Sequence, residues 1–409
     1  MGVTPIVALW AVMACTQPQP DGTPPATAPV TPPASQPAEK PAGTPAAATA
    51  LPTRDEVLSR GCEVLLRLQQ ETPGEWAYEG VYRVRGQIPI GYRIGGTAIV
   101  IEALCRAPGY DADPARQAAV RAGVSLLIEQ RTHPLMSHAD YDGGYDVRSW
   151  AYIYSLQTLS VLDRAGQLPG DLAAAAREAR AWYLQALIAT EIPKAGGWNY
   201  ARPAGRATVA PPSPFMTAVA VDALLEARAA GETVDEAVIQ RALDVLDRSH
   251  GPAGNVVYAV AEGRGSSPSD RTPGAVGRMC AVESALLRAG RGSVRDARGA
   301  VDAFLVHWKW LDDRRAKPGT HTGPYAVAPY YFMFAHHAAA RAIELLPQGE
   351  REEYRRRLAE RLMSVRAEDG SWNDRVFPRS AAYGTAIAML CLTQSSASTL
   401  PAQPVPPGR

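Results

Sequence analysis

Apolar residues along the chain follow one order six times between Arg54 and Gln394. Each unit holds an Ala- and Leu-rich stretch with helical spacing, a glycine-aromatic turn, and a second helical stretch ending in small residues and leucine. The turns read Gly74-Glu75-Trp76, Gly144-Tyr145, Gly197-Trp198, Asn255-Val256-Val257-Tyr258, Gly323-Pro324-Tyr325 and Gly370-Ser371-Trp372. The pattern predicts two helices per unit, twelve in all.

One helical hairpin cannot bury its own apolar face, so repeated hairpins must pack against neighbours. Six hairpins can close into a ring. Closure places the helix after each turn in a parallel inner barrel and the helix before each turn outside, with the turns at one end. The sequence therefore predicts an all-α fold, an (α/α)6 toroid of six helical hairpins, over residues 53–394 as one domain.

The two ends of the chain differ from this domain in composition. Residues 1–15 are short and apolar and end in Val12-Met13-Ala14-Cys15, too short to span a bilayer as a permanent helix. They resemble a bacterial lipoprotein signal, which implies a lipidated Cys15, although the basic residues that usually begin such a signal are absent. A secretory signal and a cytoplasmic protein with a different start are the alternatives.

Residues 16–52 are rich in Pro, Ala and Thr, and residues 395–409 are similar. Such segments cannot bury enough apolar surface to offset chain entropy, so we expect a disordered linker and a disordered tail. With Cys15 lipidated, the linker would hold the domain on a membrane. The expected location is then the bacterial cell envelope, facing the periplasm.

Charge and cysteine content limit the partners, metal sites and disulfides that we expect. The chain has 42 basic and 41 acidic residues, mixed along its length, for a net charge of +1, so nucleic acid is not an expected partner. No cysteine pair has the spacing of a structural zinc site. Buried free thiols are expected, but the helix register also places Cys105 and Cys391 on neighbouring inner helices across the seam of the ring, where a disulfide is an open alternative.

The six repeats resemble those of the terpenoid cyclase and protein prenyltransferase toroid superfamily. The resemblance covers most of residues 54–394 and is clearest in the turns at 194–200 and 369–372. It is closest to bacterial proteins described as carrying prenyltransferase and squalene-oxidase repeats. It implies the toroid fold but little about chemistry, because one fold can host several functions.

Two active-site patterns that this resemblance implies are incomplete. The Asp-x-Asp-Asp acid of squalene-type cyclases is absent; the nearest residues are Asp140, Asp142 and Asp146. The zinc site of the prenyltransferases has a partial counterpart in Cys280, Glu283 and His336, which would suit a catalytic zinc ion if they met. A core cysteine and a hydrogen-bonded histidine are the simpler interpretation. Zinc is therefore chemically feasible but not favoured, and no other cofactor is indicated.

Polar residues share one register near the ends of the predicted inner helices: Glu102, Gln157, Asp222, Ser284 and His337. Buried carboxylates must pair or face a wet cavity. These side chains could therefore ring a cavity, or form ion pairs with arginines between inner and outer helices. Carbohydrate chemistry, which also uses carboxylate pairs in such barrels, would rely on Glu102 and Asp222.

Aromatic residues and arginines gather at the starts of the same helices. Space-filling is one explanation; a mouth for a ligand with an apolar body and an anionic or carbonyl head is the other. The candidate ligand-binding residues are Trp150, Arg278, Tyr330, Tyr331, His337 and Tyr383.

Two functional hypotheses follow. The first is an envelope-anchored toroid that binds an apolar ligand, isoprenoid or lipid-like, or a peptide. The second is a cyclase- or prenyltransferase-like enzyme on a hydrophobic substrate, with Glu283, His336 or Asp146 as acid or base.

Overall fold

The computed structural model describes residues 52–69, 73–139, 144–145, 147–202 and 209–393, and this part of the chain contains twelve α-helices. The first helix of each hairpin is α1 (Arg54–Leu68), α3 (Pro114–Gln130), α5 (Ala173–Ala189), α7 (Glu236–Arg248), α9 (Val294–Asp312) or α11 (Gln348–Met363). The second is α2 (Ile90–Arg106), α4 (Arg148–Arg164), α6 (Pro214–Ala229), α8 (Thr272–Arg288), α10 (Tyr331–Ile343) or α12 (Ala381–Leu392).

Short elements lie in the connections between these helices. Strands β1 (Gly144–Tyr145) and β2 (Ala201–Arg202) pair antiparallel. Four 3₁₀ turns cover Tyr110–Ala112, Pro134–Met136, Pro268–Asp270 and Pro378–Ser380.

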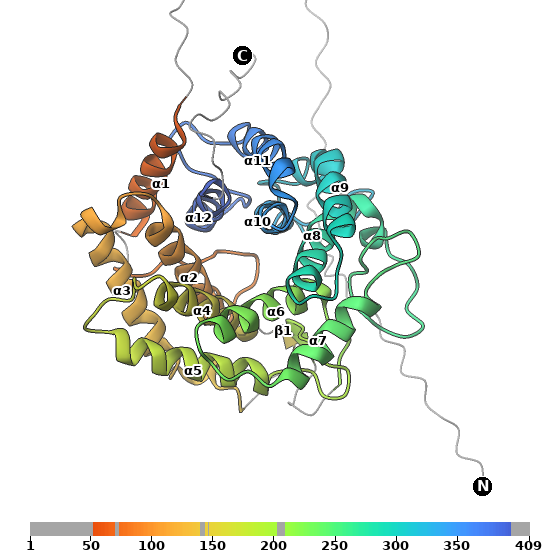
Figure 1. Cartoon of the computed structure of the whole chain (residues 1–409), viewed down its shortest axis with the longest axis horizontal. Helices are drawn as coiled ribbons and strands as arrows, with labels where there is room; N and C mark the ends of the chain where they lie inside the picture. Colours follow the sequence, from red (N-terminus) through yellow and green to blue (C-terminus); the bar gives the residue numbers. More distant parts are fainter. Residues whose placement is uncertain (1–51, 70–72, 140–143, 146, 203–208, 394–409) are drawn as a thin grey trace, which may run out of the picture. The chain divides into compact units, whose positions relative to one another are not determined.

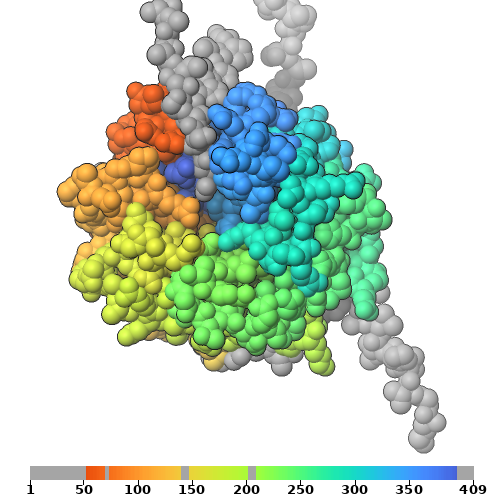
Figure 2. All heavy atoms as spheres, viewed as in Figure 1, coloured from red at the N-terminus to blue at the C-terminus, as the bar shows by residue number. Residues whose placement is uncertain are grey.

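The even-numbered helices form a closed inner ring. Each packs against the next in the order α2, α4, α6, α8, α10, α12, and α12 packs against α2 (Figure 1). The odd-numbered helices lie outside them, and in the space-filling view α12 shows only as a small dark-blue patch between α1 and α11 (Figure 2). The predicted six hairpins, with the second helix of each inside, are confirmed.

Three of the predicted turns share one hydrogen-bonding geometry, which explains why tryptophan recurs there. The indole N–H groups of Trp76, Trp198 and Trp372 donate to the carbonyls of Leu65, Leu187 and Leu362 near the ends of the preceding outer helices, at 2.7–2.8 Å. Their backbone N–H groups donate to the hydroxyls of Thr97, Thr217 and Thr385 on the following inner helices, at 2.9–3.1 Å. Each buried tryptophan therefore ties an outer helix to its inner partner.

A glycine allows this close approach in two of the units. A Cβ atom at Gly96 would lie 2.4 Å from the Trp76 carbonyl oxygen, and one at Gly384 would lie 2.3 Å from that of Trp372. Real Cβ contacts are not that short, so the inner helix can pass the turn only without a side chain at these positions.

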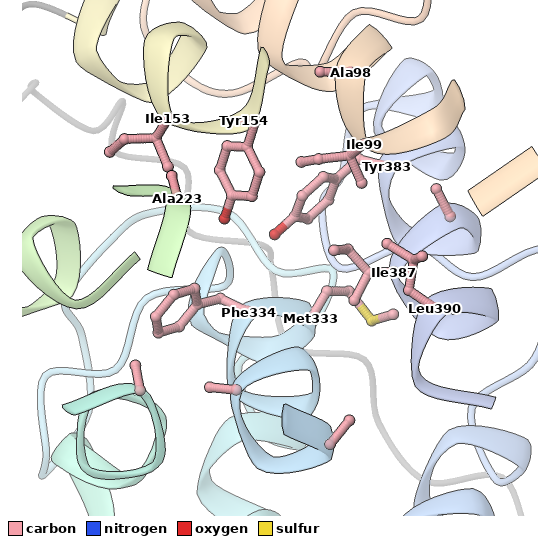
Figure 3. Packing of buried hydrophobic residues seen from close by; sticks show 14 of the residues in the cluster. Ala98, Ile99, Ile153, Tyr154, Ala223, Met333, Phe334, Tyr383, Ile387 and Leu390 are labelled. Carbon is pink, nitrogen blue, oxygen red and sulfur yellow. The ribbon is translucent and has the colours of Figure 1, made fainter. Parts of the chain in front are cut away.

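The middle of the inner barrel is packed with side chains rather than open. Tyr154 of α4 and Tyr383 of α12 point their hydroxyl groups toward the centre, opposite Met333 and Phe334 of α10 (Figure 3). Buried aliphatic residues such as Ile99 fill the space around them. Side chains therefore fill the middle of the barrel and separate its two ends.

The predicted signal, Cys15, the linker and the tail all lie outside the described residues. None of the described helices has the length and apolar character needed to cross a membrane.

Cys105 and Cys391 are both buried free thiols, so they form no disulfide across the seam.

Candidate functional site

A cavity lined by aromatic side chains opens at the end of the barrel where the inner helices begin. We call it the aromatic cavity. It contains about 640 Å³ of space not occupied by atoms, counting the open mouth. Its lining residues are Tyr78, Gly80, Val81, Tyr82, Tyr92, Val147, Trp150, Tyr200, Phe215, Met216, Tyr330, Arg375 and Tyr383.

The aromatic walls come from two groups of inner helices. On one side, α2, α4 and α12 contribute Tyr92, Trp150 and Tyr383, which pack around Tyr78 of the first turn with ring centroids 4.6–5.6 Å from its own. On the other side, Phe215 at the start of α6 contacts Tyr330 at 6.1 Å between ring centroids. These edge-on and tilted contacts hold the rings in fixed orientations, so the lining is largely preformed.

Three buried polar groups lie at the α12 side of this cavity. Arg375 is 5% exposed, lines the cavity, and forms no ion pair with a described carboxylate within 4 Å; its guanidinium carbon lies 5.7 Å from the Phe377 ring centroid. The Tyr78 hydroxyl lies beside Arg375 but has no hydrogen bond of good geometry. Asp374 is fully buried, and neither carboxyl oxygen has a hydrogen-bond partner in the described structure.

Burial dominates the electrostatics of these groups. It raises the pKa of Asp374 to about 7, against the opposing effect of Arg375. Burial likewise raises the pKa of Tyr78 well above its ordinary value, and Asp374 adds to the shift. Buried polar groups without partners are rare in proteins, which marks this corner of the aromatic cavity as unusual.

The structure brings three of the predicted ligand-binding residues, Trp150, Tyr330 and Tyr383, to the wall of this cavity. Tyr331 lies just behind the wall, packed against Phe215 with ring centroids 5.6 Å apart. Asp146 lies outside the described residues.

Arg278 occupies a different place from the one expected at the mouth. It is 1% exposed and donates from Nη2 to the carbonyls of Ser269 and Val256. Its guanidinium carbon lies 5.5 Å from the ring centroid of Tyr258 and 5.6 Å from that of Tyr331. Arg278 therefore holds a loop against α8 behind the aromatic wall, because its length lets it reach loop carbonyls rather than the open space.

A second cavity, the polar cavity, lies at the opposite end of the barrel, where the inner helices end. It contains about 750 Å³ of unoccupied space, counting its opening. Its polar lining residues are Glu102, Arg106, Gln157, Glu226, Arg288, His337, Arg341 and Glu344. Asp222 and Ser284 line a smaller adjoining space that shares Gln157, His337 and Arg341 with it. The predicted polar ring therefore exists, and His337 belongs to this end rather than to the aromatic one.

Arginines of the inner helices pair with the carboxylates of this ring. Arg106 Nε lies 3.0 Å from Glu102 Oε1, and Arg288 contacts Asp222 at 2.5 Å and Glu226 at 2.6 Å. Arg341 joins Asp222, at 3.1 Å, to the Gln157 side chain. The Glu102 pair thus lies within α2 and the Asp222 and Glu226 pairs run between inner helices, whereas the ion-pair alternative from the sequence had joined inner to outer helices.

The charges of this network shift the pKa values of its side chains. Burial acts to raise the pKa of Glu226, but Arg288, Arg341 and Arg164 outweigh burial and lower it. Burial lowers the pKa of His337 to about 3, helped by Arg341 and Arg106, so this imidazole is neutral at physiological pH. The predicted carbohydrate-directed pair, Glu102 and Asp222, is held in these ion pairs.

The other predicted catalytic residues lie apart from both cavities. His336 is fully buried between α9 and α10: its Nε2 accepts a hydrogen bond from the Trp308 indole at 2.9 Å, and its Nδ1 lies 2.7 Å from the Phe332 carbonyl oxygen. Burial lowers the pKa of His336 to about 4. Glu283 Oε1 instead lies 2.7 Å from Nε2 of His250, which follows α7.

The proposed zinc ligands do not meet. The Cys280 thiol donates to the Ala300 carbonyl of α9 at 3.4 Å, so it faces an outer helix. Among the described residues there is no group of three or more His, Cys, Asp and Glu side chains that could hold a metal ion. Cys280 and His336 both pack against outer helices because their positions on α8 and α10 face away from the barrel axis.

Comparisons with known proteins bear on the fold. No family model and no curated protein matches the chain. Among solved structures, the α-1,6-mannanase GH76A of Salegentibacter sp. HEL1_6, as an inactive variant with α-1,6-mannotriose, has a TM-score of 0.54 at 12% identity, over 83% of this chain and 98% of that one. The fold is an (α/α)6 toroid.

Two further similar structures have lower TM-scores. The type II terpene cyclase MstE from Scytonema gives 0.45 at 15% identity, covering 83% of this chain and 98% of that chain. A glycosidase variant in complex with glucose gives 0.49 at 11% identity, covering 83% and 95%. Identities this low concern the fold alone.

Sequence reasoning missed the residues at the α12 side of the aromatic cavity. Asp374 and Arg375 lie two and three residues after the turn tryptophan Trp372, whereas the predicted candidates came from the turns and from the inner helices. The available signal was a charged pair inside an otherwise apolar connection. Tyr78, two residues after Trp76, has the matching place in the first unit.

Proposed function

We propose that this protein binds an apolar small molecule, isoprenoid or lipid-like, in the aromatic cavity. The observation that carries the proposal is the lining itself: eight aromatic side chains and one cation around a preformed space. Small-molecule sites are typically concave, mostly apolar and fitted with a few polar groups, within roughly 300–1,000 Å³.

Apolar residues around the opening support this proposal. Val81 and Tyr82 line the cavity and are 44% and 37% exposed. Val84, Val209 and Val376 are also at least 37% exposed and lie on loops that precede inner helices. Neighbouring exposed apolar side chains such as Val81 and Tyr82 are typical of interaction surfaces. A ligand that prefers apolar surroundings would meet them before it entered the cavity.

Phe215→Ala tests the proposal. Phe215 lines the cavity from α6 and contacts Tyr330, so its loss removes much of one wall. Burying an aromatic side chain against a ligand contributes about 1.5–3 kcal/mol, so the affinity for 1-decanol or farnesol, measured by isothermal titration calorimetry, should fall roughly ten- to hundredfold. Trp310→Phe, on outer helix α9, is the matched control. Absence of binding to the wild-type protein would refute the proposal.

We also propose that Cys15 is lipidated and anchors the protein to the bacterial cell envelope, facing the periplasm. The support is the apolar segment before Cys15 and the Pro-rich segment after it. Cys15→Ala should move the protein from the membrane fraction to the soluble fraction of the host cell. An unchanged distribution would contradict the anchor without affecting the cavity proposal.

A further inference from the structure

Arg375 is the one charged residue that lines the aromatic cavity within the described chain. It is 95% buried, and no described carboxylate neutralises it through an ion pair. A buried guanidinium carries several N–H donors and no acceptor, and it is costly to leave unpaired. An anion supplied from outside would remove that cost.

The inner helices add a second, independent preference for an anion. All six begin at this end of the barrel, and none carries an acidic residue in its first turn. Each helix N-terminus carries a partial positive charge. The aromatic cavity therefore lies at the positive ends of the inner helices, with a guanidinium in its wall.

We propose that the ligand of the aromatic cavity is an apolar carboxylic acid whose carboxylate pairs with Arg375. This inference rests on the proposed binding function and specifies the chemical class of the ligand. The aromatic rings take the apolar body, and the planar guanidinium donates two parallel hydrogen bonds to the two carboxylate oxygens. The Tyr78 hydroxyl, beside Arg375 and without a partner, is placed to donate a third.

The charge count favours a carboxylate over a phosphate. One guanidinium matches one negative charge, whereas a phosphate monoester carries up to two near neutral pH. Asp374 lies next in the chain and is buried nearby, and no second arginine or lysine lines the cavity in the described structure. A dianion would thus bring an extra negative charge close to a buried carboxyl group without a second cation.

The experiment compares three probes with the same ten-carbon chain, decanoate, 1-decanol and decyl phosphate, bound to the full-length protein at pH 6, where Asp374, whose pKa is about 7, is mostly protonated and decanoate is ionised. Charge-assisted bidentate hydrogen bonds are about twice as strong as neutral ones, so decanoate should bind about tenfold more tightly than 1-decanol. Arg375→Met keeps an unbranched apolar stem but removes the guanidinium and its charge. It should abolish the preference for decanoate while leaving the affinity for 1-decanol within about twofold.

Arg83→Met is the matched control. Arg83 also lies over the Phe377 ring, at 5.5 Å, but it pairs with Glu79 and does not line the cavity. Its loss should leave the preference unchanged. Equal affinities of the wild-type protein for decanoate and 1-decanol would overturn the inference even if Arg375→Met does not fold.

The remaining outcomes separate the two proposals. Tighter binding of decyl phosphate that depends on Arg375 would replace the carboxylate with a phosphate and overturn the assignment. Binding of 1-decanol without any headgroup preference would leave the proposed function standing and remove the inference. Failure of all three probes would remove both.

Discussion

Asp374→Asn tests the electrostatics of the aromatic cavity without any ligand. The carboxyl group is fully buried, neither oxygen has a partner in the described structure, and its pKa is raised from 3.8 to about 7. In the unfolded chain the group ionises near its ordinary pKa. Between roughly pH 4 and pH 7 the folded protein therefore binds more protons than the unfolded one, and its stability falls as pH rises.

The size of the effect follows from the shift. About three pKa units at 1.36 kcal/mol each give an upper limit of about 4 kcal/mol of lost stability above pH 7. A domain of about 340 residues has an unfolding entropy near 0.7 kcal/mol/K, so this corresponds to about 6 °C in Tm. Asparagine has nearly the same shape as the protonated acid and cannot ionise.

The assay is thermal unfolding of the wild type and the variant at pH 5 and pH 8.5. At pH 5 the two Tm values should agree within about 2 °C; at pH 8.5 the variant should unfold up to about 6 °C higher. Asp171→Asn is the control, because Asp171 is exposed and its pKa is lowered by Arg121. An Asp374→Asn effect of the same size at both pH values would refute the reasoning.

Two other predictions concern the fold around the cavities. Trp198→Phe removes the indole donor to the Leu187 carbonyl, which keeps its hydrogen bonds from Thr190, and leaves unfilled space at a fully buried position. It should lower the unfolding free energy measured in urea by about 1–3 kcal/mol, whereas Trp310→Phe, on α9, should change it by less than about 1 kcal/mol. The hydrogen bond to Glu283 raises the pKa of His250 from 6.5 to about 9, so the pair stabilises the fold fully below about pH 6.5 and loses its effect as pH rises through about 9. Glu283→Gln should bring the His250 pKa, followed by NMR titration, back toward 6.5 and flatten that part of the stability profile; an unchanged titration would show that the pair does not form.

The sequence predicted the architecture because the repeat is itself the packing unit. Trp76, Trp198 and Trp372 recur because each must reach a carbonyl of the preceding helix and a threonine of the following one. Such short-range geometry leaves the same residue types at the same spacing, which can be read from one chain. The order of inner and outer helices then follows from closure of the ring.

The site was predicted only in part, because helix register does not determine side-chain direction by itself. Trp150, Tyr330 and Tyr383 were expected at the cavity and line it. His336 belongs to the same helix as His337, one residue away, yet it faces α9 while His337 faces the polar cavity. A rotation of about 100° per residue separates these two environments, and no repeat pattern fixes the phase that precisely.

The contrast between the two ends of the barrel follows from the direction of the inner helices. At the ends of these helices, α2, α4, α6, α8 and α10 each carry an arginine in the last turn. Cations there compensate the negative helix C-termini, and the carboxylates of neighbouring helices pair with several of them, as in the contacts of Arg288 with Asp222 and Glu226.

The polar cavity is thus accounted for by interactions within the fold. At the opposite end none of the six inner helices carries an acidic residue in its first turn, and Arg375 adds to the positive charge. An anionic ligand can balance this positive charge. We therefore propose that ligand binding takes place at the aromatic end. Charge reversal at the polar end, such as Arg341→Glu, should therefore weaken folding but leave the decanoate preference of the folded fraction unchanged.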